Sequence, residues 1–355
     1  MTDPISDDPA PAESESGDTL LSGDSAHEYD HPHEIDHTGE YHDDCYDEYP
    51  RPPSFWRRLW NRRRWFYLAA VLFVLWVSYL LFDNNISLTG TTRAEFVAQL
   101  DRSNVLATEW MLERKYEFYE GTANPALVYM IRDMAGMTPD SSLTQIPEAF
   151  IRRRQNSGSI WVRMIDPSVE VRKVTLHELE AMADYQAWIA YGMAPDKVLL
   201  EEQEIASMLS PSAHARGSRT HQVLALLIAR EHGRAPEVLS PNAESIDELI
   251  DTLCEGIASE AVWDVRVTDH YLQRVALLLS AGRPDLVKRR WVERILAHQK
   301  AEGGYPESWY GWGPGFLQFS FNPSPPSAHA SVQGFWITYM LKHRYGEWID
   351  QNFEE

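Results

Sequence analysis

The sequence predicts an all-α protein in which one membrane-spanning helix precedes a series of helical hairpins. Three observations lead to this prediction. One run of apolar residues is long enough to cross a bilayer, apolar residues further along recur at helical spacing, and similar glycine-containing turns return along the rest of the chain. With 355 residues, 44% of them apolar, the chain can bury a core of ordinary size.

Residues 1–50 are predicted to be a disordered, acidic, histidine-rich tail. They contain 16 Asp and Glu residues, no Lys or Arg, and few aliphatic side chains to offset the entropy lost on folding. This acidity argues against binding to nucleic acid, which needs basic surface. The tail histidines either hold a divalent metal loosely or belong to a solvated polyanion, and they are His27, His31, His33, His37 and His42.

Residues 65–82 are predicted to form a transmembrane helix. This segment carries no charge and would be ~27 Å long as a helix, close to the thickness of a bilayer core. Six arginines lie in the juxtamembrane segment 51–64, whereas the first basic residue after the span is Arg93. The positive-inside rule then places the tail in the cytoplasm and the following domain outside it. The predicted location is the inner (plasma) membrane, with the domain outside the cytoplasm, which is the periplasm if the cell is Gram-negative.

Residues 86–355 are predicted to be one extracytoplasmic helical domain. Residues 92–119 place apolar side chains, among them Phe96, Leu100 and Trp110, on one helical face. A glycine that ends one helix in the left-handed conformation, and a proline or acid that begins the next, recur 41 to 64 residues apart. These turns are residues 135–140, 191–196, 232–237, 281–285 and 345–348. They indicate about five to six αα-hairpins, arranged as an open solenoid or a closed toroid.

The helices that precede these turns are expected to form an inner layer. They are apolar on nearly every side, whereas those that follow the turns have one apolar face and suit an outer layer. The five expected inner segments are ALVYMIRDM, YQAWIAYG, VLALLIA, LQRVALLL and VQGFWITYML.

Histidines recur at the starts of helices. His177, His214, His270 and His329 each follow a Ser or Thr by two positions. That Ser or Thr is a good N-cap, so each histidine falls in the first helical turn and faces one common mouth. The helix dipole there favours neutral imidazole, which can act as a base or a metal ligand. Such residues can also be plain surface groups. The catalytic candidates are His177, His270, His329 and Asp269, the last as an acid or as a partner that orients a ring.

The long loop at residues 298–330 is the second candidate feature. It is rich in aromatic side chains and glycine, which is unusual for a simple connection. Aromatic faces near carboxylates suit stacking on sugar rings or enclosure of an apolar chain, and the alternative is a plug that closes the centre of the domain. The candidate binding residues are Glu302, Tyr305, Glu307, Trp309, Tyr310 and Trp312.

The stretch ILAHQKAEGGY, with Gln299 before Gly303, Gly304 and Tyr305, resembles the αα-toroid superfamilies. These are the terpenoid cyclase and protein prenyltransferase group, in which glutamine followed by GGW or GGF recurs, and the six-hairpin glycosidases and polysaccharide lyases. The resemblance covers most of residues 122–355 and implies the closed toroid. It carries over no catalytic residue, because WDVRVTD is not the DxDD of the cyclases and no prenyltransferase zinc set is present. It identifies neither a cofactor nor a resident metal.

Two functions are compatible with the sequence. The first is an envelope enzyme, a lyase or hydrolase acting on a glycan, in which one of the candidate histidines is the base and Asp269, Glu302 or Glu307 is the acid or charge partner. The alternative is a non-catalytic binding or scaffold subunit of a membrane or envelope complex, whose domain docks a protein partner. A metal at the mouth of the domain is compatible with either.

Overall fold

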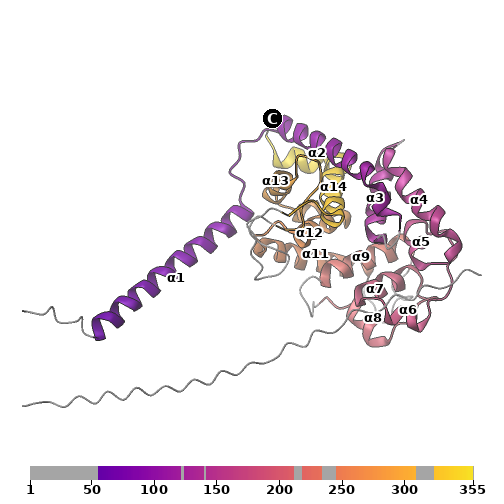
Figure 1. The fold of residues 1–355 in the computed structure, drawn as a ribbon, viewed down its shortest axis with the longest axis horizontal. Coiled ribbons are helices and arrows are strands. Elements are labelled where there is room, and N and C mark those ends of the chain that lie inside the picture. Colours follow the sequence, from indigo (N-terminus) through magenta and orange to yellow (C-terminus); the bar gives the residue numbers. More distant parts are fainter. Residues whose placement is uncertain are drawn as a thin grey trace, which may run out of the picture. The chain divides into compact units, whose positions relative to one another are not determined.

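The computed structural model describes residues 55–120, 124–139, 141–211, 218–233, 245–308 and 324–354. The chain divides into two units, Met1–Asn61 and Arg62–Glu355, and, apart from the first residues of helix α1, the features below belong to the second. In the described residues all regular structure is helical (Figure 1), apart from one isolated bridge between Pro306 and Pro326. The all-α prediction is therefore confirmed. The predicted acidic tail, residues 1–50, lies outside the described residues.

Helix α1 (Phe55–Asn85) contains the apolar segment. Its portion Arg62–Asn85 is, among the described residues, the one helix long and apolar enough to cross a membrane, and no part of its most apolar window is buried. The part of this helix that belongs to the second unit begins at Arg62. Near the end of the helix Val77, Leu80 and Leu81 are partly covered, whereas most of the preceding apolar side chains are exposed.

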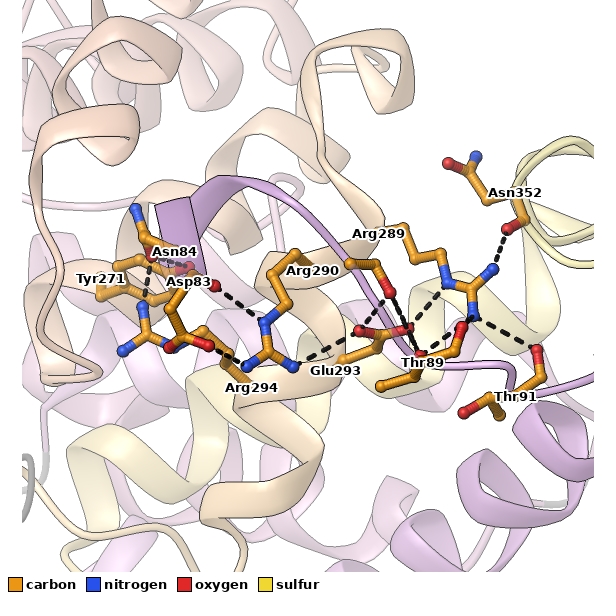
Figure 2. Close-up of polar contacts among 11 residues, drawn as sticks. Asp83, Asn84, Thr89, Thr91, Tyr271, Arg289, Arg290, Glu293, Arg294 and Asn352 are labelled. Atoms are coloured by element: carbon orange, nitrogen blue, oxygen red, sulfur yellow. Dashed lines mark hydrogen bonds and ion pairs between the residues drawn. The ribbon is translucent and has the colours of Figure 1, made fainter. Parts of the chain in front are cut away.

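The exit of α1 is joined to the rest of the unit by polar contacts (Figure 2). Asn84 is fully buried, and its side-chain amide donates a hydrogen bond to the carbonyl oxygen of Ala261 at 2.9 Å. Its side-chain oxygen accepts hydrogen bonds from the hydroxyl of Tyr271 at 3.1 Å and from the guanidinium of Arg294. A buried amide with all of these partners fixes the position of the helix end, because each lost contact would leave a polar group unpaired.

The segment that follows α1 is held by helix α13 (Arg289–His298). The carboxylate of Glu293 accepts hydrogen bonds from Ser87 at 2.8 Å and Thr89 at 2.6 Å, and from Arg289 at 2.7 Å. Figure 2 shows this chain of contacts running from Asp83 to the backbone of Asn352. The connection between α1 and α2 is therefore tied down along its length.

Helix α2 (Arg93–Glu113) begins with a capping box. Thr92 accepts a hydrogen bond from the backbone N–H of Glu95 at 3.3 Å, and the Glu95 carboxylate accepts one from the N–H of Thr92 at 2.9 Å. Phe96, Leu100 and Trp110 are buried on one side of the helix. This confirms the predicted apolar face over α2, although the helix ends at Glu113 and not at residue 119.

The five segments expected to form an inner layer are the most deeply buried helices. In α14, for example, every residue from Ala330 to Leu341 is buried. The residues at 271–279 in α12 are buried as well, so neither helix has a solvent-facing side there. These helices are α3 (Pro125–Met137), α7 (Asp184–Met193), α9 (Ser218–Glu231), α12 (Asp269–Ser280) and α14 (Ala328–His343).

The helices after the turns are more polar. In α11 (Ile246–Trp263) the buried residues Ile246, Ile250, Leu253, Ile257 and Ala261 recur every three or four positions, which makes one buried face. The other helices are α4 (Gln145–Arg154), α5 (Ile160–Ile165), α6 (Leu176–Glu180), α8 (Glu202–Met208) and α15 (Gly346–Asn352). Short 3₁₀ segments are η1 (Lys115–Phe118), η2 (Ser142–Thr144), η3 (Gln155–Ser157) and η4 (Pro284–Leu286).

The turn glycines serve two different purposes. Gly233 and Gly282 have φ values of 65° and 84°, the left-handed conformation predicted for them. Gly136 and Gly192 lie inside helices and Gly346 begins one, so the predicted left-handed cap is wrong at these three. At Gly192 the reason is packing, because a Cβ atom there would lie 2.8 Å from the carbonyl oxygen of Ala225 on α9. Glycine at this position lets α7 and α9 approach closely.

Neighbouring helices of the unit contact one another in sequence (Figure 1). Helix α3 packs on α5, α5 on α7, α7 on α9, α9 on α12, and α12 on α14, which in turn contacts α3. Helix α11 packs against both α9 and α12, and α2 packs against α14. The N-terminal ends of α7, α9, α12 and α14 carry the polar side chains described next.

Candidate functional site

Helix α12 begins with Asp269 and His270, and the first of these organises the helix start. Thr268 precedes the helix in extended conformation, but its side chain forms no capping hydrogen bond. The Asp269 carboxylate instead accepts one from the backbone N–H of His270 at 2.8 Å. The same oxygen, Oδ1, lies 3.0 Å from Nδ1 of the His270 ring. Asp269 therefore holds both the backbone and the imidazole of its neighbour.

The second oxygen of Asp269 engages a histidine from another helix. Oδ2 lies 3.3 Å from Nδ1 of His329, the second residue of α14. Ser327 is the N-cap of that helix and accepts a hydrogen bond from the N–H of Ala330 at 3.2 Å, as the sequence predicted. The structure thus brings together three of the four predicted catalytic residues. We refer to Asp269, His270 and His329 as the Asp–His cluster.

The electrostatics of the cluster favour an ionised carboxylate. Burial opposes ionisation of Asp269, but the hydrogen bonds from His270 and His329 outweigh it and hold the pKa of this carboxyl well below its usual range. The hydrogen bond to Asp269 raises the pKa of His270 above its ordinary value, against the opposing effect of burial. The direction of this shift is opposite to the one expected from the helix dipole, because a carboxylate in direct contact outweighs the partial charge of a helix end.

Further polar side chains extend the cluster along the starts of the neighbouring helices. The amide nitrogen of Gln333 lies 3.2 Å from Nε2 of His329, and that of Gln273 lies 3.4 Å from Nε2 of His221. The His221 ring stacks on Tyr185 with 4.3 Å between ring centroids. Sequence reasoning missed both glutamines. The available signal was a glutamine one helical turn after a histidine inside an otherwise apolar helix.

His177 is not connected to this cluster. It occupies the predicted second position of a helix whose N-cap, Thr175, forms a capping box with Glu178. That helix, α6, has no buried residue, and the next core helix begins only at Asp184. Within the described residues no hydrogen bond or ion pair joins His177 to the cluster. His214 lies outside the described residues.

The glycine motif of the long loop is structural. Tyr305 is fully buried and its hydroxyl lies 3.1 Å from the hydroxyl of Ser103 on α2. The amide of Gln299 donates hydrogen bonds to the carbonyl oxygens of Ser103 at 3.0 Å and Gly303 at 2.8 Å. A Cβ atom at Gly304 would lie 2.8 Å from the ring of Trp110. Tyr305 is therefore a core residue that fixes the loop to α2, not the exposed binding residue that the sequence suggested.

The two ends of the loop lie beside the Asp–His cluster. The carbonyl oxygen of Glu307 accepts a hydrogen bond from the N–H of Asp269 at 3.2 Å. Ser308 and Ser324 are joined by a hydrogen bond between their hydroxyls, so the chain leaves and returns at one place. The side chains of Glu302 and Glu307 are exposed, which suits the binding role predicted for them. Three other predicted binding residues lie outside the described residues: Trp309, Tyr310 and Trp312.

The geometry of the cluster suits acid–base chemistry. Nδ1 of His270 faces the Asp269 carboxylate, and no described residue forms a hydrogen bond with Nε2 on the opposite side of the ring. The His270 side chain is 57% exposed, so Nε2 can exchange protons with a bound molecule. The cluster is less suited to a metal ion because Nδ1 of each imidazole points at the carboxylate. Among the described residues no group of three or more His, Cys, Asp or Glu side chains is placed to hold one.

Comparison with known proteins finds no matching family model, no matching curated protein and no matching solved structure.

Proposed function

We propose that this chain is a single-pass membrane-anchored envelope enzyme, a lyase or hydrolase that acts on a glycan through acid–base chemistry at the Asp–His cluster. One observation carries the proposal: the Asp269 carboxylate is hydrogen-bonded to Nδ1 of two imidazoles from different helices. An aspartate that orients a histidine and stabilises its protonated form is a recurring device of general acid–base catalysis.

Membrane anchoring is supported by helix α1. Its apolar portion is exposed in the isolated chain, which would be unfavourable in water but suits a bilayer. The arginines precede the apolar segment, and the positive-inside rule would then place the N-terminus in the cytoplasm and the helical domain outside it, at the inner (plasma) membrane.

The closed toroid is supported by the order of helix contacts. The buried helices follow one another from α3 to α14, and α14 also contacts α3. A ring of this kind brings the N-terminal ends of α7, α9, α12 and α14 to one face. The stacking of Tyr185 on His221, the contact between His221 and Gln273, and the Asp–His cluster are the arrangement expected at such a face.

In the proposed reaction Nε2 of His270 removes a proton from the attacking water, or from the carbon next to a sugar carboxyl group in a lyase. Asp269 stabilises the imidazolium that forms, and the proton is then available to the departing glycosidic oxygen. A pKa raised above the ordinary value favours this second, acidic step at neutral pH. The exposed carboxylates of Glu302 and Glu307 and the aromatic loop residues would bind the sugar rings.

The test uses the full chain in mild detergent and a panel of envelope glycans, scored for new reducing ends and for unsaturated products. His270→Ala should lower turnover by about 10²-fold or more, the range for loss of a general base. His329→Ala should also lower turnover, because Asp269 loses one of the two imidazoles that hold its carboxylate. His177→Ala is the matched control, because His177 has the same position in its helix but no contact with the cluster. Turnover that survives both cluster substitutions would refute the proposed site.

A binding or scaffold role is the second candidate, and one surface favours it. Leu176 and Leu199 are 72% and 66% exposed. Their segments run side by side, because the N–H of Val174 donates a hydrogen bond to the carbonyl oxygen of Lys197 at 2.9 Å. Exposed leucines on neighbouring segments suit contact with a protein partner. This role predicts partners that copurify after gentle extraction and are lost in Leu176→Asp with Leu199→Asp, but not in His270→Ala.

A further inference from the structure

A cavity of about 640 Å³ lies between the end of the apolar helix and the helical domain. Its size is within the range of small-molecule binding sites. One wall comes from α1, and the other comes from α9, α11, α12 and the segment between the last two. The polar contacts of Asn84 with Ala261 and Tyr271 hold these walls in place. The cavity is thus built by the fixed junction at the exit of α1.

The α1 wall of the cavity is apolar. It consists of Trp76, Val77, Leu80 and Leu81, which lie in the last two turns of the apolar segment. Trp76 lies seven positions before Asp83, the first charged residue after the apolar segment, so this wall extends ~10 Å back along the helix from that residue. In a bilayer that distance corresponds to the outer part of one leaflet.

The domain wall of the cavity is charged. The guanidinium of Arg274 bridges two carboxylates, with Nε 3.2 Å from Glu260 and Nη1 2.7 Å from Asp264. Arg219 contacts Glu260 at 2.6 Å, and Nε of Arg266 contacts Asp264 at 3.1 Å. Three arginines and two carboxylates leave one excess positive charge (3 − 2 = 1).

This wall keeps donors available for an anion. Within the part of the chain that the structure describes, no group accepts a hydrogen bond from the terminal nitrogens of Arg266, whose side chain is 26% exposed. A Cβ atom at Gly256 would lie 2.7 Å from Nε of Arg219, so glycine at this position gives the Arg219 guanidinium room to lie across α11. Guanidinium groups with unused N–H donors are well suited to phosphate.

The rim of the cavity carries Trp263, which is 69% exposed. Tryptophan is enriched where proteins meet the boundary between lipid and water, because its ring is apolar and its N–H can reach water. An exposed tryptophan beside the exit of an apolar helix places the opening of the cavity at that boundary. Its occupant would therefore come from the bilayer.

We propose that this cavity binds one anionic phospholipid from the leaflet on the domain's side. Arg266 and Arg219 hold the phosphate, and an acyl chain lies along Trp76 and Leu80. A purely polar ligand would fit poorly against the apolar wall. The excess positive charge favours an anionic headgroup over a zwitterionic one. The inference rests on the proposed membrane anchoring of α1 and is independent of the proposed chemistry at the Asp–His cluster.

The test titrates the full chain, in an uncharged detergent, with dioctanoyl phosphatidylglycerol and follows binding by calorimetry. Saturable binding is expected, and Arg266→Gln should weaken it by about tenfold through the loss of one charge-assisted contact. Ser259 lines the cavity and is exposed, so Ser259→Trp should block binding by filling the space. Absence of saturable binding, or wild-type binding by both variants, would overturn the proposal.

Two control variants and two further ligands test whether binding is specific to this cavity and to an anionic lipid. Arg283→Gln removes an arginine that, like Arg266, is ion-paired, here with Asp251 and Asp285, but does not line the cavity. Thr252→Trp adds the same ring as Ser259→Trp at an exposed position of the same helix. Both controls should bind as the wild type does. Equal affinity for inorganic phosphate would overturn the lipid as the occupant, and equal affinity for dioctanoyl phosphatidylcholine would overturn the preference for an anion.

Membrane anchoring is tested separately, by extraction of wild-type membranes with alkaline carbonate. Release of the chain would refute the anchoring itself. A chain that stays in the membrane but shows no saturable phosphatidylglycerol binding would refute the lipid site alone. The turnover measurements with His270→Ala decide the proposed enzyme activity without reference to either result.

Discussion

The side-chain amide of Gln333 lies one helical turn after His329, with its nitrogen 3.2 Å from Nε2 of that ring. Because Nδ1 of the same ring faces Asp269, the imidazole is held from both sides. Gln333 is fully buried, and its other polar atom, Oε1, has no hydrogen-bond partner among the described residues. A buried oxygen without a partner costs stability, so this residue is a poor choice for packing alone.

Gln333→Met should therefore release the His329 ring while it changes the stability of the protein little. Methionine has a similar volume and removes the unpaired oxygen, so we expect the free energy of unfolding to change by less than about 1.5 kcal/mol. The His329 ring loses one of its two fixed contacts and should become mobile. Nitrogen NMR of histidine-labelled protein would show this as a changed Nε2 signal for His329. An unchanged signal would mean that Gln333 does not position the ring.

The pKa of His270 should depend on Asp269. Asp269→Asn removes the carboxylate that raises this pKa, so the His270 pKa should fall towards its ordinary value of about 6.5. An NMR titration of His270 in wild type and variant measures the change directly. The same titration followed at His343, which has no contact with Asp269, should give identical curves. A His270 pKa that is unaffected by the substitution would contradict the ion pair.

The pair also predicts how stability depends on pH. Asp269 has a lowered pKa, so its contribution is present above about pH 4 and is lost as the pH falls through its value in the folded chain. His270 has a raised pKa, so its contribution is present below about pH 6.5 and is lost as the pH rises through its value in the folded chain. The unfolding midpoints of the wild type and of Asp269→Asn should therefore differ most between about pH 4 and about pH 6.5. A constant difference from pH 3 to pH 9 would contradict this prediction.

Two glycine-to-alanine substitutions should change stability in opposite directions. At Gly192 the new Cβ atom would lie 2.8 Å from the carbonyl oxygen of Ala225, so α7 and α9 must separate and stability should fall by about 1–3 kcal/mol. At Gly136 a Cβ atom meets nothing within 4 Å, so alanine in this helical position should add about 0.5–1 kcal/mol. Urea unfolding of the two variants measures both. Equal effects would show that the close approach of α7 and α9 is not as described.

Asn84→Leu tests the junction at the exit of α1. The substitution leaves the hydroxyl of Tyr271 and part of the Arg294 guanidinium without their acceptor in a buried place, so stability should fall by about 2–4 kcal/mol. Asn352→Leu is the control, because among the described residues its side chain bonds to the Trp348 carbonyl oxygen, within its own helix, and to no other group. Thermal unfolding in detergent compares the two. Similar midpoints for both variants would show that Asn84 does not hold the junction.

Much of the helical layout follows from sequence periodicity. The five segments expected to lie inside are the deeply buried helices, because a helix without a polar face can be stable only where protein covers every side. The Ser or Thr two positions earlier also located His270 and His329 correctly at the second position of their helices, although Ser327 forms the expected capping hydrogen bond and Thr268 does not. These predictions depend on the spacing of residues within one helix, and that spacing is the same in the sequence and in the folded protein.

Other features depend on which segments meet and could not be read from local pattern. His177 fits the same cap rule as His270, yet its helix is short and exposed. Tyr305 looks like a loop aromatic, but the two glycines before it allow the loop to dock on α2 and bury it. The direction of the His270 pKa shift depends on the distance to the Asp269 side chain, which sequence adjacency alone does not give.

The junction at Asn84 determines how far the domain can stand from a membrane. A domain on a flexible linker can sample many heights above a bilayer and can reach material well away from it. Here the apolar helix ends inside the domain, and the residues that follow are bonded to α13. If α1 crosses a membrane, as we propose, the Asp–His cluster stays at one height above the lipid surface. Any molecule it acts on must then be carried to that height or be attached to the membrane already.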